Sequence, residues 1–173
     1  MPSEKPQTPG YSEKNRVNVR YTRIIEELKL HPSLAEKRGV TSNQLEALYL
    51  LACQLYYTEC FDKAADLFRL LCFYQPGDAK NWMGLGGAHQ HIENHEAALA
   101  AFIMAYLHDP QNPEPRLYAA HSLIDLKNLP LALESAELAV ELCARDHNHD
   151  ATRKNAISLC SALKDYLKSV NHK

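Results

Sequence analysis

The chain has 173 residues and a formal net charge of -2 at pH 7. Because basic residues are scattered among acidic ones, this charge gives no reason to expect nucleic acid or an acidic membrane as a partner. No apolar run approaches the ~20 residues that span a bilayer, and no apolar signal segment stands at the N-terminus, so we expect no stable membrane insertion and no cleaved leader. Five cysteines without a CxxC pair predict reduced thiols in the cytoplasm.

The N-terminal region divides into a tail and a helix. Residues 1–15 are rich in Pro, Ser, Lys and Glu, which predicts a disordered tail. From Asn15 to Leu30 apolar side chains follow helical spacing and predict an amphipathic helix. Its apolar face comprises Val17, Tyr21, Ile24, Ile25 and Leu28. His31 and Pro32 end this helix.

A 34-residue spacing organises the middle of the chain. Thr41 and Gln44 form a capping-box pattern that opens the first helix of this region. The spacing is clearest in one segment, at Trp82, Leu85, Gly86, Ala98, Phe102, Ala105 and Pro110, and shifting it by 34 residues in either direction finds partial copies. This is the pattern of a tetratricopeptide repeat, a helix hairpin whose helices approach closely at small residues. We predict three repeats, at 45–78, 79–112 and 113–146, the last one degenerate.

The predicted fold is therefore all-α, with residues 16–173 forming one domain of three tandem helix hairpins in a short superhelix. A last helix at about 152–170 carries a narrow apolar seam. Its expected role is to cap the end of the array, and the alternative is a dedicated partner-binding helix.

The concave face of such an array is lined by the first helix of each hairpin, at repeat positions 2, 5, 9 and 12. An apolar and aromatic floor there predicts pockets for an extended peptide, with Gly87 letting the peptide backbone come close. The predicted peptide-binding residues are Tyr49, Cys53, Tyr56, Met83, Gly87, Gln90, Leu117, His121 and Ile124. We expect Tyr49, Tyr56, Met83 and Leu117 to carry the anchor pockets. Any of the nine could instead contact only neighbouring helices.

One kind of ligand is disfavoured. Tetratricopeptide domains that hold the carboxylate-ended tails of heat-shock chaperones use Lys, Asn and Arg at set positions. Here those positions hold Tyr49, Cys53, Gly84, Glu114 and Tyr118. Because Glu114 would repel a carboxylate, apolar recognition is favoured.

Four motifs are more specific than the general tetratricopeptide pattern: LEALYLLA, LFRLLCFYQPGDAK, WMGLGGAHQ and PEPRLYAAHSL. With these motifs, residues 18–168 resemble the class II type III secretion chaperones. The resemblance implies a Gram-negative cytoplasmic chaperone that binds hydrophobic translocator proteins before export and keeps them from aggregating or inserting into membranes. It also implies homodimerisation through the helix at Val17–Leu28, and in some relatives work with a transcriptional regulator.

Other functions are weaker. The chain shows no phosphate loop, nucleophile elbow or HExxH helix, so we predict no enzyme and no cofactor. His91 and His95 have a metal-ligand spacing, but Glu93 and Asn94 place a turn between them, so no metal site is predicted. A second class stays open, namely a tetratricopeptide adaptor or regulatory scaffold that joins folded partners.

Overall fold

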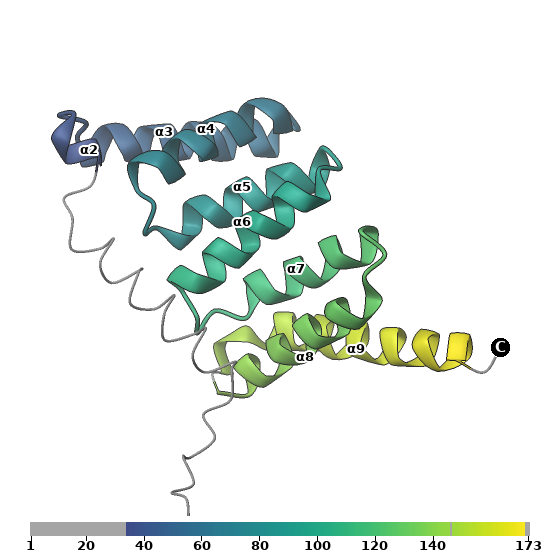
Figure 1. The fold of residues 1–173 in the computed structure, drawn as a ribbon. Helices are drawn as coiled ribbons and strands as arrows, with labels where there is room; N and C mark the ends of the chain where they lie inside the picture. The colour runs from purple at the N-terminus through teal and green to yellow at the C-terminus, as the bar shows by residue number, and fades with distance from the viewer. Residues whose placement is uncertain (1–33, 146, 172–173) are drawn as a thin grey trace, which may run out of the picture.

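A computed structural model describes residues 34–145 and 147–171 (Figure 1). The predicted tail at 1–15 and the predicted dimerisation helix at Val17–Leu28 lie outside these residues. The described part is all-α and has no strand. Its elements are α2 (Leu34–Lys37), α3 (Ser42–Tyr57), α4 (Phe61–Tyr74), α5 (Ala79–His91), α6 (His95–His108), α7 (Glu114–Asp125), α8 (Leu129–Arg145), the short 3-10 helix η1 (His147–His149) and α9 (Asp150–Asn171).

Capping residues fix where the helices begin. The capping box of α3 is present as predicted: the Gln44 backbone N–H donates to the Thr41 hydroxyl (3.3 Å), and the Thr41 N–H donates to the Gln44 side chain (2.9 Å). Asp78 and Asn94 cap α5 and α6 in the same sense, accepting from backbone N–H groups at 3.1 and 3.2 Å. These contacts satisfy donors that a helix start otherwise leaves without partners.

The three hairpin turns repeat one backbone device. Glu59, Glu93 and Lys127 stand 34 residues apart, and all three adopt a left-handed conformation with φ near 60°. The next residue of each turn donates its N–H to a carbonyl of the preceding helix, at 2.8 to 2.9 Å. Such left-handed closures satisfy the last carbonyls of a helix and reverse the chain. The period of the sequence is therefore a period of the backbone as well.

Small residues sit where the helices of each hairpin cross, as the spacing predicts. Ala52 and Ala64 are fully buried between α3 and α4, and Ala120 and Ala132 are fully buried in the third hairpin. In the second hairpin a Cβ on Gly86 would overlap the ring of Phe102. Successive helices pack in antiparallel pairs, and the three hairpins stack one after another. The first helices of the hairpins, α3, α5 and α7, lie on the same side of the array (Figure 1).

The C-terminal end departs in detail from the predicted bounds. No proline follows the third hairpin, and α8 runs to Arg145, close to the predicted end of the third repeat at 146. Helix α9 then begins at Asp150 and packs on α8 and α7 through Ala156, Cys160 and Leu163. It lies as the first helix of a fourth hairpin would lie. None of the helices within the described ranges is long and apolar enough to cross a lipid bilayer.

Candidate binding groove

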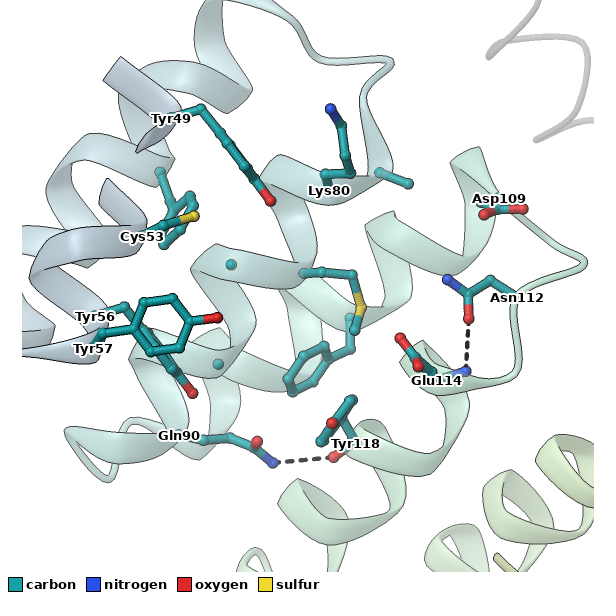
Figure 2. Close-up of a pocket in the computed structure, with 16 residues that line it drawn as sticks. Tyr49, Cys53, Tyr56, Tyr57, Lys80, Gln90, Asp109, Asn112, Glu114 and Tyr118 are labelled. Carbon is teal, nitrogen blue, oxygen red and sulfur yellow. Dashed lines mark hydrogen bonds between the residues drawn. The ribbon is translucent and has the colours of Figure 1, made fainter. Parts of the chain in front are cut away.

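A groove of about 370 Å³ opens on the side of the array formed by α3, α5 and α7 (Figure 2). Aromatic side chains, glycines and one methionine make up most of its lining, with charged side chains at the edge. The lining residues are Tyr49, Cys53, Tyr56, Tyr57, Phe68, Ala79, Lys80, Met83, Gly84, Gly87, Gln90, Phe102, Asp109, Asn112, Glu114 and Tyr118.

Two glycines three residues apart form a strip along one face of α5, in the middle of the groove. A Cβ on Gly84 would overlap the ring of Phe68, a core residue that is only 3% exposed. A Cβ on Gly87 would lie 3.2 Å from the hydroxyl oxygen of Tyr56. The missing side chains therefore let rings from the first repeat lie close against α5. The sequence predicted that the open space at Gly87 would admit a peptide backbone. In the structure the Tyr56 hydroxyl lies beside this space.

The wall formed by α3 is aromatic. Tyr49 meets Phe68 edge-on, with ring centroids 6.0 Å apart. Tyr56 makes edge contacts with Phe61 and His91, both at 5.3 Å, while Phe61 and His91 stack at 4.1 Å. Such contacts hold aromatic rings in place without using their polar tips. The aromatic rings thus give this wall an apolar surface, and the tyrosine hydroxyl groups can face water or a ligand.

Charge lies at the edge of the groove. The Lys80 ammonium lies 5.2 Å from the Tyr49 ring centroid and 3.7 Å from the Asp78 carboxylate. Across the groove Asp109 and Glu114 form an acidic side (Figure 2). Burial, with a smaller contribution from Cys53, raises the pKa of Tyr49 to about 12. The groove therefore disfavours the charged phenolate form of Tyr49, as a largely apolar surface does.

The wall formed by α7 depends on Tyr118. Its ring stacks on Phe102 with centroids 5.6 Å apart and 42% of the residue is exposed. Asn112 accepts from the Glu114 N–H at 3.0 Å and orders the start of α7. Gln90 of α5 reaches across to α7 and donates to the Tyr118 carbonyl at 3.1 Å. The α7 wall is therefore connected to the middle of the groove.

The structure brings six of the nine predicted peptide-binding residues together in this groove, namely Tyr49, Cys53, Tyr56, Met83, Gly87 and Gln90. It places the three from α7 elsewhere. Leu117 is 5% exposed and packs against Ala139 and Ala156 of α8 and α9. Ile124 packs in the cluster of Leu123 and Leu163, and His121 is exposed outside the lining. For Leu117 and Ile124 the reason is α9, which lies beside α7 and packs against both side chains.

The prediction missed lining residues that do not belong to the four concave repeat positions. Tyr118 and Gly84 both occupy repeat position 6, and Phe68 and Phe102 come from the second helices of their hairpins. A signal was present for one of them, Gly84. Gly84 and Gly87 stand three apart on one helix face, which indicates that something lies close to that face. The contribution of the second helices could not be read from first-helix positions.

The groove offers apolar contact, ring edges and a few hydrogen-bonding groups. All five cysteines are free thiols, and Cys53 is the one that reaches the groove. In the described part of the chain, His, Cys, Asp and Glu side chains form no cluster of three or more that could hold a metal ion.

This fold and groove define a tetratricopeptide-repeat protein with a concave binding surface. The tetratricopeptide repeat family model matches residues 45–78, the first hairpin. The chain is 26% identical over 137 residues to low calcium response locus protein H of Yersinia pestis, covering 79% of this chain and 82% of that protein.

Two solved structures are similar over most of their length. PcrH from Pseudomonas aeruginosa is 30% identical with a TM-score of 0.71, covering 76% of this chain and 99% of that one. The type III secretion chaperone SycD of Yersinia enterocolitica, solved in complex with a peptide of the translocator YopD, is 27% identical with a TM-score of 0.70, covering 75% and 97%. The chain belongs to this family, the class II type III secretion chaperones of translocator proteins.

Proposed function

We propose that this protein holds an extended apolar segment of a translocator protein in the groove between α3, α5 and α7. The chaperone would act in the cytoplasm before the client is exported. There it keeps the client from aggregating and from inserting into a membrane. One observation carries the proposal: most of the groove lining is aromatic or apolar, and the rings of Tyr49 and Tyr118 pack on Phe68 and Phe102 of the second helices. A preformed apolar groove can compete with membranes and with self-association for apolar client segments.

The relatives support the same chemistry. SycD binds a peptide of the translocator YopD. In this chain the acidic side formed by Asp109 and Glu114 would repel a C-terminal carboxylate, whereas an internal segment carries no such charge. An internal, extended and apolar segment is therefore the client feature that fits best. Dimerisation through Val17–Leu28 stays a prediction, because that segment lies outside the described residues.

The groove is tested by co-expressing the protein with the translocators of its own secretion system and purifying the complex. Changing both Tyr49 and Met83 to Ala removes lining from α3 and α5, and we expect it to abolish co-purification with unchanged helical content. The matched control changes Tyr166 and Leu131 to Ala, since these exposed residues lie on α9 and α8 outside the groove. Client binding that survives the first double substitution would sink the groove assignment.

A different result would favour the adaptor alternative. If the wild-type protein co-purifies with folded partners and with no translocator, the chaperone proposal fails. Circular dichroism of each variant alone establishes that a lost complex reflects the groove and not unfolding.

A further inference from the structure

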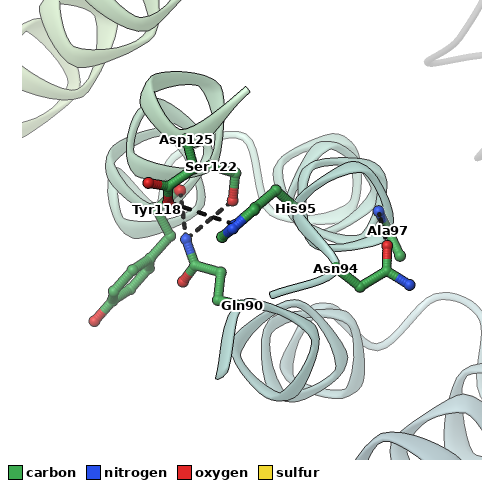
Figure 3. Close-up of polar contacts among 7 residues, drawn as sticks. All are labelled: Gln90, Asn94, His95, Ala97, Tyr118, Ser122 and Asp125. Atoms are coloured by element: carbon green, nitrogen blue, oxygen red, sulfur yellow. Dashed lines mark hydrogen bonds and ion pairs between the residues drawn. The ribbon is translucent and has the colours of Figure 1, made fainter. Parts of the chain in front are cut away.

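A polar link joins the two first helices that border the inner half of the groove. The Gln90 side-chain N–H groups on α5 donate to the Tyr118 carbonyl (3.1 Å) and to the Ser122 hydroxyl (3.0 Å) on α7 (Figure 3). Both acceptors lie on one turn of α7. The amide nitrogen of Gln90 has two hydrogens, and each has an acceptor on the protein itself. This donor end is therefore engaged with α7 and is not available to a peptide.

A second contact also joins α7 to the second hairpin. His95 at the start of α6 lies 3.4 Å from the Asp125 carboxylate at the end of α7. Figure 3 shows this contact beside the link of Gln90. The link itself reaches into the interior, because Ser122 is fully buried. A buried hydroxyl that lost its partner would be costly, so the link restrains how α7 sits against α5.

The residue at repeat position 12 packs toward the first helix of the next unit in each of the three hairpins, although only Gln90 does so through hydrogen bonds. In the first hairpin it is Tyr56, whose hydroxyl lies against Gly87 and whose ring meets His91, both on α5. In the third it is Ile124, which packs in the cluster that contains Leu163 of α9. Each of these side chains reaches forward to the first helix of the next unit. The recurrence indicates a role in spacing the helices of the array.

We propose that Gln90 is a positioning residue, which holds Tyr118 in place, and that Tyr118 is the residue of α7 that contacts the client's apolar segment. The proposal rests on the proposed function. Tyr118 is suited to this role because its ring is exposed on one side and backed by Phe102 on the other. Since Leu117 is buried under α9, Tyr118 supplies the apolar surface of α7 in the groove.

A pair of buried serines separates positioning from direct contact. Ser122→Ala removes one acceptor of Gln90, and a client cannot touch Ser122 because it is fully buried. Ser135→Ala is the matched control, since Ser135 is 4% exposed and its hydroxyl donates to the Arg116 carbonyl (2.9 Å) between α8 and α7. The probe is a fluorescein-labelled peptide from the chaperone-binding region of the co-purified translocator. We expect Ser122→Ala to weaken its affinity ~fivefold, the factor equivalent to about one hydrogen bond, and Ser135→Ala to leave it unchanged.

A double-mutant cycle tests whether Gln90 acts through Tyr118. Gln90→Met keeps the length of the side chain and removes its donors, and we expect it to weaken peptide affinity about fivefold in the wild-type background. In the Tyr118→Ala background the same change is expected to have little further effect, because the ring it positions is gone. Thermal melting of all variants verifies that each is folded at the assay temperature.

The outcomes are distinct. Effects of Gln90→Met and Tyr118→Ala that multiply independently would mean that Gln90 contacts the peptide directly, and the positioning role is then overturned. Equal losses from the two serine substitutions would overturn it too, since general destabilisation would explain both. A wild-type protein that fails to bind any translocator segment refutes the proposed function itself, and with it this inference.

Discussion

Three glycines within four residues of α5 have three different environments. Gly86 faces Phe102 within its own hairpin, Gly84 faces Phe68 of the preceding hairpin, and Gly87 faces the tip of Tyr56 at the groove. The sequence motif predicts the first because it belongs to the repeat pattern. The other two follow from which rings the neighbouring hairpin presents, and the 34-residue pattern does not encode that.

The glycines lead to a prediction of opposite signs. Gly84→Ala would force the buried ring of Phe68 to move; such overpacking costs about 1–3 kcal/mol, which a helix-propensity gain of up to ~1 kcal/mol only partly offsets. Gly87→Ala needs only a small shift of the Tyr56 hydroxyl, so its unfolding free energy is expected to stay equal or to rise by up to ~1 kcal/mol. Urea denaturation followed by circular dichroism measures both.

The matched pair controls for helix propensity, since both changes add one methyl group to the same helix. Equal effects of the two substitutions would show that the packing of Phe68 against Gly84 is not tight in solution.

At the scale of elements, the helix hairpins were the part that the sequence predicted best. Six helices of the three repeats lie where the spacing places them, because alanine or glycine at each crossing leaves few other ways to pack. The end of the array was less predictable. The position of α9 beside α7 depends on how its apolar seam meets Leu117 and Leu123, which a single narrow seam does not specify. That one placement buries two predicted groove residues, Leu117 and Ile124, against α9 and away from the groove.

Packing of α9 can be measured directly. Leu163 is 6% exposed and lies with Leu123 and Ala132 of the third hairpin. Leu163→Ala is expected to lower the unfolding free energy by about 2–5 kcal/mol, as large-to-small core substitutions do. Tyr166→Ala on the same helix is the control, because Tyr166 is 56% exposed and a surface change usually stays within about 0.5 kcal/mol.

Urea denaturation of the two variants gives the comparison. If Leu163→Ala has as small an effect as Tyr166→Ala, α9 does not cover the end of the array, and a partner-binding role for the helix gains support.

At the scale of the whole molecule, burial shifts the pKa values of several groups in the direction that favours their neutral forms. It raises the pKa of Cys72 from 9.0 to about 12 and that of Tyr49 from 10.0 to about 12. It lowers the pKa of His89 below its ordinary 6.5, with Arg69 adding to the effect. The fold therefore disfavours the charged form of each of the three groups.

These shifts set a pH window for stability. As pH rises above 9, the unfolded chain releases protons from Cys72 and then Tyr49 that the folded chain still holds, so the unfolding free energy falls between pH 9 and 12. As pH falls below 6.5, the unfolded chain binds a proton at His89 more readily than the folded chain does. The unfolding free energy therefore also falls on the acid side. We expect the maximum between about pH 7 and 9.

Two single substitutions assign the limits of that window. Tyr49→Phe removes the titrating hydroxyl, so the decline between pH 10 and 12 is expected to become shallower while the acid side is unchanged. His89→Gln keeps a polar side chain that does not titrate, so it is expected to flatten the acid side only. Unfolding free energies from urea titrations at each pH give both slopes. A stability profile whose acid slope is the same in His89→Gln as in the wild type would mean that His89 takes up its proton equally in both states, and that the fold does not hold it neutral.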